Sequence, residues 1–227
     1  MSSGPDAAST GDGGGAVGAH DGEPAASAVA AVLAAARGIR APVVLIDGPS
    51  GAGKSTLADA VIERWPGPPP TLVRLDDVYR GWTGLERAGT DLARTLLAPN
   101  RRGAVGGWRR WDWARDAPGP LERVRPGRNG LLIEGCGAFT AGARVVDAVH
   151  VWVDASDATR KRRALRRDRG AYDPYWDLWE RQWRHHVRRT SPERLATVRL
   201  RAAPDGRIEP ATAPGAVAVH AGARGLT

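Results

Sequence analysis

Short apolar runs alternate with helical patterns through the middle of the chain. The runs are continuous rather than alternating, which is typical of parallel strands buried on both faces. They cover residues 43–46, 72–75, 131–133, 149–153 and 196–200, the last of which is interrupted by Arg199. Stretches with helical character lie between and before them, at residues 25–37, 54–64, 91–97, 156–169 and 174–189. This order predicts an α/β fold with a five-stranded parallel sheet flanked by helices.

The two ends of the chain differ in composition from this central part. Residues 1–24 are mainly Gly, Ala, Ser and Asp, with too little apolar surface to offset the entropy of ordering, so we expect a disordered tail. Residues 202–227 return to Gly, Ala and Pro, with an apolar cluster at 217–219, and we expect a mostly irregular tail. A chain of 227 residues has room for one α/β domain of ordinary size, which we place at residues 25–201.

Charge and cysteine content narrow the possible classes only slightly. The formal net charge is +8, yet only two of the 33 basic residues are lysines, Lys54 and Lys161, and an arginine excess alone is a weak sign of nucleic-acid binding. The single cysteine, Cys136, rules out an internal disulfide and is compatible with a reducing cytoplasm. The start of the chain lacks a basic segment followed by an apolar one, and residues 25–36 are too short to cross a bilayer. We therefore expect a cytoplasmic protein without membrane contact.

Residues 48–55 match the phosphate-binding motif Gly-x4-Gly-Lys-Ser in full, and they lie between a predicted strand and a predicted helix. Glycines let backbone N–H groups close around phosphate oxygens, and the following helix directs its N-terminus at the same anion. We predict that this P-loop binds ATP and Mg²⁺, with Lys54 bridging the β- and γ-phosphates and Ser55 ligating the metal. The predicted nucleotide contacts are Gly48, Ser50, Gly51, Ala52, Gly53, Lys54, Ser55 and Thr56.

Two other classes of P-loop protein fit less well. A regulatory GTPase reads guanine through Asn-Lys-x-Asp, and neither Lys54 nor Lys161 follows an asparagine. A ring-forming ATPase needs an apolar run that ends in Asp-Glu, whereas residues 131–135 contain a single acid. The sequence thus favours a small-molecule kinase.

Four of the predicted strands run into an acid, at Asp47, Asp76, Glu134 and Asp154. Ligands of open α/β sheets bind outside the carboxyl ends of the strands, so these acids are candidates to face the site, although Asp47 and Asp154 can equally cap the turns that follow. We assign the general base, which accepts the proton of the acceptor hydroxyl, to Asp76, with its neighbour Asp77 as the alternative. Glu134 is a predicted metal or acceptor contact. The predicted metal contacts are Ser55, Asp76 and Glu134.

A basic stretch at residues 160–169 has Arg160, Arg163 and Arg167 at intervals of three and four, so they share one helical face. A mobile helix of this kind brings guanidinium groups to the transferred phosphate only when it closes. We expect an arginine-rich lid with Arg163 and Arg167 as its catalytic members. For most of the other basic residues in this stretch, a solvated surface is the simpler explanation.

Tryptophans supply the remaining candidates. Trp111 and Trp113 flank Asp112 at strand spacing, so both rings can point the same way, opposite to the acid. The two rings could then stack on a planar base while Asp112 holds ribose hydroxyls. Simple packing of the rings is the alternative. Trp176, Trp179 and Trp183 recur at helical spacing, a pattern more often found in a core, and we take Trp183 as a candidate acceptor contact.

Together these motifs resemble the uridine kinase family of nucleoside kinases, over residues 43–200. The similar segments are Asp76-Asp77-Val78-Tyr79-Arg80, Trp111-Asp112-Trp113, residues 133–139, residues 160–168 and Gln182-Trp183. The resemblance implies a P-loop kinase fold with Asp76 as base, and an acceptor pocket formed by Asp76, Tyr79, Trp111, Asp112, Trp113, Glu134 and Trp183. Tryptophan stands where the family has Tyr or Phe at several of these positions, and Asp91 is the remnant of an acidic segment of the family.

The predicted function is transfer of the γ-phosphate of ATP to a hydroxyl of a nucleoside, uridine- or cytidine-like, or of a related small alcohol. The alternatives are a natural-product or antibiotic phosphotransferase on the same fold and an ATP-dependent nucleic-acid-binding protein. Few aromatic residues lie among the basic residues of the lid segment, which favours a small-molecule acceptor over a nucleic-acid partner.

Overall fold

The structure, a computed structural model, describes residues 24–211 of the chain. Most of the predicted N-terminal tail, residues 1–23, and the apolar cluster at 217–219 lie outside these residues. In the described part, no helix is both long and apolar enough to pass through a bilayer.

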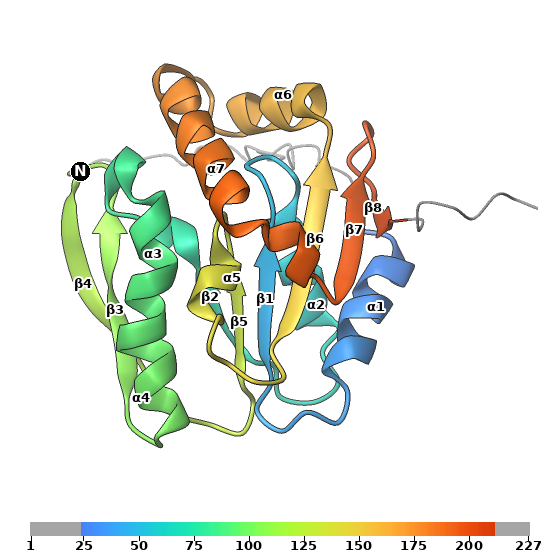
Figure 1. Cartoon of the computed structure of the whole chain (residues 1–227), viewed down its shortest axis with the longest axis vertical. Helices are drawn as coiled ribbons and strands as arrows, with labels where there is room; N and C mark the ends of the chain where they lie inside the picture. The colour runs from blue at the N-terminus through green and yellow to red at the C-terminus, as the bar shows by residue number, and fades with distance from the viewer. Residues whose placement is uncertain (1–23, 212–227) are drawn as a thin grey trace, which may run out of the picture.

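A central sheet forms the middle of the molecule (Figure 1). Within residues 24–211 it has six strands in the order β2-β5-β1-β6-β7-β8. The strands are β1 Val43–Asp47, β2 Thr71–Arg74, β5 Leu131–Glu134, β6 Val149–Ala155, β7 Val198–Ala202 and β8 Ile208–Pro210. The parallel sheet is confirmed through β7, whereas β8 pairs antiparallel with β7 and was not predicted. This edge strand lies in the segment 202–227, for which the sequence indicated mostly irregular structure.

The helices largely follow the predicted stretches. They are α1 Ala26–Ala36, α2 Lys54–Glu63, α3 Leu85–Leu92, α4 Ala98–Arg101, α5 Ala138–Ala141, α6 Asp157–Arg167 and α7 Trp176–Thr190. The helix predicted at residues 91–97 begins earlier, at Leu85, and a π-helical turn, Ala93–Leu97, joins α3 to α4. Helix α6 begins where the Ser156 hydroxyl accepts a hydrogen bond from the Thr159 N–H, which caps its first turn.

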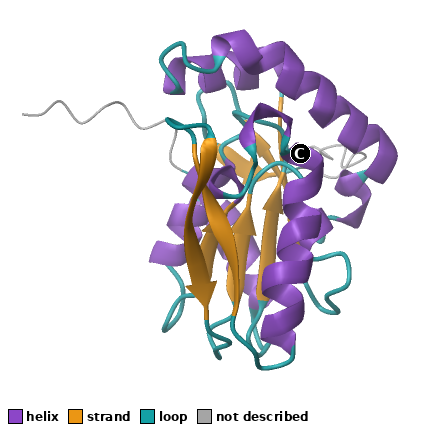
Figure 2. Cartoon of the chain, turned by 90° about the vertical axis from the view of Figure 1, so that its left-hand side faces the viewer, coloured by secondary structure: helices purple, strands orange, loops and turns teal. Residues whose placement is uncertain are grey.

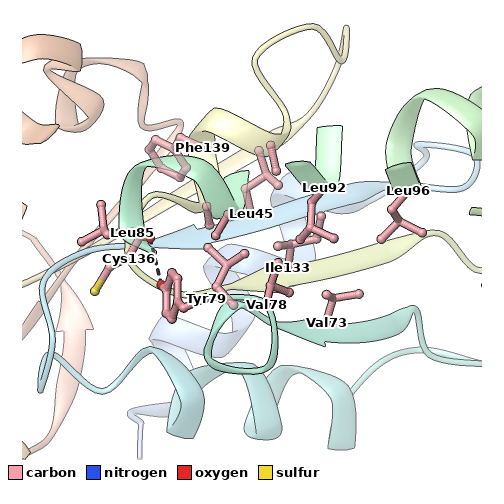
Figure 3. Close-up of a cluster of buried hydrophobic side chains, with 14 of the residues drawn as sticks. Leu45, Val73, Val78, Tyr79, Leu85, Leu92, Leu96, Ile133, Cys136 and Phe139 are labelled. Carbon is pink, nitrogen blue, oxygen red and sulfur yellow. Dashed lines mark hydrogen bonds between the residues drawn. The ribbon is translucent and has the colours of Figure 1, made fainter. Parts of the chain in front are cut away.

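Both faces of the sheet are buried, which explains the continuous apolar runs. Leu45 of β1 packs in a core with residues of α3, α5 and α7, part of which Figure 3 shows. Its neighbours Val44 and Ile46 pack in a second core with residues of α1 and α2. Successive residues of a strand point to opposite faces, so a strand covered on both sides needs apolar residues at every position.

A separate antiparallel hairpin stands beside the sheet next to α3 and was not predicted. It consists of β3 Gly106–Asp112 and β4 Ala117–Val124. The hairpin is at the left of the molecule in Figure 1 and faces the viewer in Figure 2. The end of the hairpin at Trp113 lies next to the short 3-10 turn Leu75–Asp77 that follows β2, because the Trp113 indole N–H donates to the carbonyl oxygen of Asp76.

Candidate active site

The P-loop joins the end of β1 to the start of α2, at the carboxyl edge of the sheet (Figure 1). Gly51 has a φ of +78°, and a Cβ added to it would clash with the backbone carbonyl of Arg160. A Cβ on Gly48, at φ +147°, would clash with the carbonyl of Val153. Neighbouring backbone thus packs against the loop so closely that only glycine fits, which leaves a cradle lined by main-chain groups.

The N-terminus of α2 completes this cradle. Its N-cap residue is Gly53, and no side chain caps the first turn, so the N–H groups there remain available to an anion. The Lys54 ammonium lies in the same place, 2.9 Å from the carbonyl oxygen of Pro49 and 3.6 Å from the Cys136 sulfur. Main-chain donors, a helix N-terminus and a buried lysine are the groups that hold a triphosphate.

Ser55 and Glu134 meet directly across the carboxyl edge. The Ser55 hydroxyl donates to Glu134 Oε1 over 2.9 Å, and Arg74 Nη1 donates to the same oxygen over 3.2 Å. Burial, followed by the nearby negative charge of Asp76, raises the pKa of Glu134, while Lys54, Ser55 and Arg74 oppose that shift. A hydroxyl and a carboxylate beside the phosphate cradle, with Asp76 close by, fit the oxygen ligands that Mg²⁺ takes in phosphotransfer sites.

Asp47 and Asp154, the other strand-end acids, have structural roles. Asp47 is fully buried and accepts hydrogen bonds from the N–H groups of Gly48, Gly137 and Phe139, at 2.7, 2.8 and 2.9 Å. Burial raises the pKa of Asp47 to about 6 despite these three donors. Asp47 therefore ties the start of the P-loop to the turn after β5, and Asp154 forms an exposed ion pair with Arg201.

A cavity of about 640 Å³ opens from the P-loop toward the hairpin. The P-loop and the start of α2 contribute Ser50, Gly51, Gly53, Lys54, Ser55 and Thr56 to its lining. The same cavity is lined by Asp76, Asp77, Tyr79, Trp82, Trp113, Tyr172, Tyr175 and Trp179. Glu134, Cys136, Arg163 and Arg167 also line it. One chamber therefore contains the phosphate cradle, the two candidate bases and a wall of aromatic rings.

The aromatic wall is built around Trp82. Its ring stacks on Tyr175 at 4.4 Å and 8° and on Tyr172 at 5.0 Å and 20°, and the Trp113 ring lies 4.9 Å away. Gln182 Nε2 donates to the Trp82 carbonyl over 2.6 Å, which attaches this segment to α7. Sequence reasoning missed Trp82, Tyr172 and Tyr175, since they come from separate segments without any repeating pattern. The only sign in the sequence was that Trp82 closely follows Asp76 and that Tyr172 and Tyr175 closely follow the basic stretch at residues 160–169.

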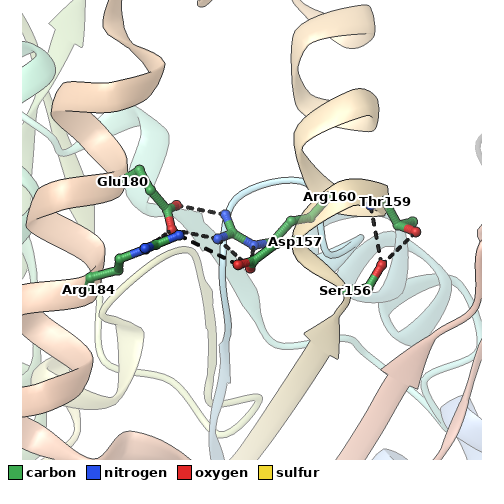
Figure 4. Close-up of polar contacts among 6 residues, drawn as sticks. All are labelled: Ser156, Asp157, Thr159, Arg160, Glu180 and Arg184. Carbon is green, nitrogen blue, oxygen red and sulfur yellow. Dashed lines mark hydrogen bonds and ion pairs between the residues drawn. The ribbon is translucent and has the colours of Figure 1, made fainter.

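The arginines of α6 divide into two groups. Arg163 and Arg167 line the cavity. Arg160 instead points to α7, where it forms an ion pair with Glu180 (Figure 4). Arg167 forms an ion pair with Asp168 at 2.8 Å; this hydrogen bond and, more weakly, the charge of Asp76 raise the pKa of Arg167.

Three predicted acceptor contacts are not brought to this cavity. Asp112 Oδ1 accepts hydrogen bonds from the N–H groups of Ala114 and Arg115, both at 3.1 Å, so it caps the hairpin turn. Trp111 lines a second cavity, of about 520 Å³, between the hairpin and α3. Trp183 is buried and stacks on Trp152 at 5.8 Å.

The common orientation expected for Trp111 and Trp113 is thus corrected. Strand β3 ends at Asp112, so the alternation that would align the two rings does not continue to Trp113. Trp113 lines the main cavity, and so does Tyr79, whose hydroxyl donates to the Cys136 carbonyl over 2.9 Å (Figure 3). The Tyr79 side chain therefore forms part of the cavity wall, and its hydroxyl already donates its hydrogen bond to the protein.

Comparison with known proteins identifies the type of fold. No protein-family model and no curated protein sequence matches the chain. The structure is similar to that of a possible uridine kinase from Bacillus stearothermophilus, with a TM-score of 0.51 and 17% identity, over 75% of this chain and 96% of that one. A candidate fructose transport system kinase from Silicibacter sp. TM1040 aligns at a TM-score of 0.42 and 21% identity, over 65% of this chain and 84% of that one. The first similarity shows that the chain has a uridine kinase-like P-loop fold.

Proposed function

We propose that this chain, built on the P-loop kinase fold, transfers the γ-phosphate of ATP to a hydroxyl of a small molecule, and that the acceptor is a nucleoside of the uridine or cytidine type. The observation that carries the proposal is the single cavity that joins the P-loop to the Asp76 carboxylate and to the ring of Trp82. A phosphate donor and an acceptor bound at its two ends would meet beside Asp76.

The roles follow from position. The backbone of Gly48 to Ser55 and the Lys54 ammonium hold the phosphates, and Ser55 with Glu134 and Asp76 would hold Mg²⁺, which neutralises charge on the phosphate oxygens. Asp76 accepts the proton of the acceptor hydroxyl. Arg163 and Arg167 bring positive charge to the transferred group.

The aromatic wall favours a planar acceptor. The side chains of Trp113 and Tyr175 are partly open, at 37% and 39% exposure, so their rings can receive another ring by stacking. A pyrimidine provides such a ring, and its ribose provides the hydroxyl. An aminoglycoside, as in the alternative of an antibiotic phosphotransferase, has no planar ring to stack.

The proposal is tested by incubating the protein with Mg²⁺ and ATP against uridine, cytidine, adenosine, simple sugars and aminoglycosides. We expect ADP and a nucleoside monophosphate, identified by mass spectrometry, with uridine or cytidine. Lys54→Ala is the control, because it removes the phosphate-binding ammonium. Phosphorylation of aminoglycosides alone would favour the antibiotic-modifying alternative. Tight, salt-sensitive oligonucleotide binding without any phosphorylated product would contradict the kinase proposal.

A further inference from the structure

Two adjacent carboxylates, Asp76 and Asp77, line the cavity from the same 3-10 turn, Leu75–Asp77. Only one can accept a proton from a given acceptor hydroxyl, and a second free carboxylate beside it would repel the triphosphate. The structure holds these two side chains in different ways.

Asp77 is bound by the hairpin. Arg110 of β3 donates from Nε to Asp77 Oδ1 over 3.0 Å, although the two residues are 33 positions apart. This ion pair places a positive charge beside Asp77 and holds its carboxylate toward β3. The neighbouring Arg109 donates instead to the Gly119 carbonyl within the hairpin, over 3.2 Å.

The hairpin also holds the main chain of the turn. The indole N–H of Trp113 donates to the carbonyl oxygen of Asp76 over 2.8 Å. Farther along, Gly81 has a φ of +67°, and a Cβ placed there would lie 3.3 Å from Asp116 Oδ1 and 3.8 Å from the Trp111 ring. The hairpin thus holds the turn through two hydrogen bonds and lies so near Gly81 that a larger residue there would press against it.

Asp76, in contrast, acts on the phosphate side of the cavity. Its negative charge lies close enough to Glu134 and Arg167 to contribute, together with burial of Glu134 and the Asp168 hydrogen bond of Arg167, to the raised pKa of each. The hydrogen bond from Arg110 to Asp77 therefore distinguishes the two neighbours.

We infer that the β3–β4 hairpin is a positioning element for catalysis: Arg110 binds Asp77, Trp113 fixes the carbonyl of Asp76, and together they present Asp76 alone to the acceptor hydroxyl. The inference rests on the proposed function, in which Asp76 is the base. Arg110 and the indole N–H of Trp113 act through the turn and not on a substrate, whereas the Trp113 ring lines the cavity.

The test uses Arg110→Gln, Asp77→Asn and the double variant, assayed with Mg²⁺, ATP and uridine or another acceptor that the panel identifies. Arg110→Gln frees the Asp77 carboxylate, so kcat should fall about 10-fold while KM for ATP changes less than about twofold. Arg110→Lys keeps the charge and should recover part of the loss. In the double variant no carboxylate is left to misplace, so kcat should return to within about threefold of the wild type. Arg109→Gln, on the same strand, is the matched control and should behave as the wild type.

A second measurement does not depend on activity. The amides of Val78 and Tyr79 donate to the Leu75 carbonyl at 2.8 and 2.9 Å and so report closure of the turn. Trp113→Phe keeps a ring but loses the indole N–H, so hydrogen exchange of these two amides should become faster, with the α2 amides unchanged.

Additive losses in the double variant, or unchanged exchange in Trp113→Phe, would overturn the inference. If the wild type phosphorylates no acceptor, the proposed function fails by itself. The exchange measurement then decides alone whether the hairpin holds the turn.

Discussion

Arg160 and Glu180 join α6 to α7 through two hydrogen bonds of 2.8 and 2.6 Å (Figure 4). The Arg160 side chain is only 4% exposed, so the pair is largely removed from water. Since the carbonyl of Arg160 also packs against Gly51, this ion pair holds the first turn of α6 against the P-loop. Arg163 and Arg167 on the same helix then reach the cavity.

Glu180→Gln should therefore destabilise the protein by about 2 kcal/mol, because it leaves a buried guanidinium with a weaker partner. Hydrogen bonds from Arg160 and Arg184 lower the pKa of Glu180 against the effect of burial. The stabilisation is thus present at neutral pH and is lost as the pH falls through the lowered pKa, and the variant should lose less stability in acid than the wild type. Urea unfolding at several pH values measures both effects.

The exposed ion pair between Arg207 and Glu209 provides the control Glu209→Gln, for which we expect a change in the free energy of unfolding below about 0.5 kcal/mol. An equally small effect of Glu180→Gln would show that the pair of Arg160 and Glu180 does not hold α6 against the P-loop.

Asp76→Asn should lower kcat by about 10²- to 10⁴-fold with little change in ATP affinity, since a general base acts in the transition state. Steady-state kinetics and calorimetric titration with ATP separate the two quantities. Asp77→Asn should lower kcat much less, because Arg110 binds the Asp77 carboxylate in the wild type. A larger loss in Asp77→Asn would move the base to the neighbouring residue.

Asp112→Ala should act on stability rather than on acceptor binding. It removes the acceptor for two turn N–H groups, which corresponds to a loss of about 1 kcal/mol, while KM for the acceptor should stay within about twofold. Asp112→Asn keeps an acceptor oxygen and should be closer to the wild type. Thermal unfolding and acceptor kinetics on both variants test this, and a large rise in KM in a stable Asp112→Ala protein would restore a binding role to Asp112.

Cys136 offers a pH-dependent probe of the phosphate end of the cavity. Burial raises the pKa of its thiol above the ordinary value of 9.0, although the neighbouring Lys54 opposes the shift. Because the thiolate is the reactive form, alkylation by iodoacetamide should be slow at pH 7 and should still accelerate above pH 9. Bound ATP should slow it further. Cys136 is the single cysteine of the chain, so intact-mass measurement counts the modification directly, with Cys136→Ala as the unlabelled control. Fast labelling that levels off near pH 8 would contradict the buried position.

The sequence by itself determined the parallel sheet and the phosphate cradle. Strands such as β5 are covered on both faces, so they need apolar residues at every position, and that requirement is visible as a continuous run. The motif at Gly48 to Ser55 was readable because all its groups are neighbours in the chain. The hairpin left no such trace. Strand β3 reads Gly-Gly-Trp-Arg-Arg-Trp-Asp, and β4 contains Pro118 and Pro120, so neither shows the pattern of a strand.

Only the tertiary structure decided what surrounds the acceptor end of the cavity. Trp82, Trp113 and Tyr175 come from three segments whose meeting depends on how the hairpin and α7 pack, and no local periodicity encodes that arrangement. Only the tertiary structure also distinguishes Asp76 from Asp77, which are adjacent residues of the same type in the sequence. A hydrogen bond from Arg110 distinguishes them, and that residue reaches Asp77 only because the chain folds back over 33 positions.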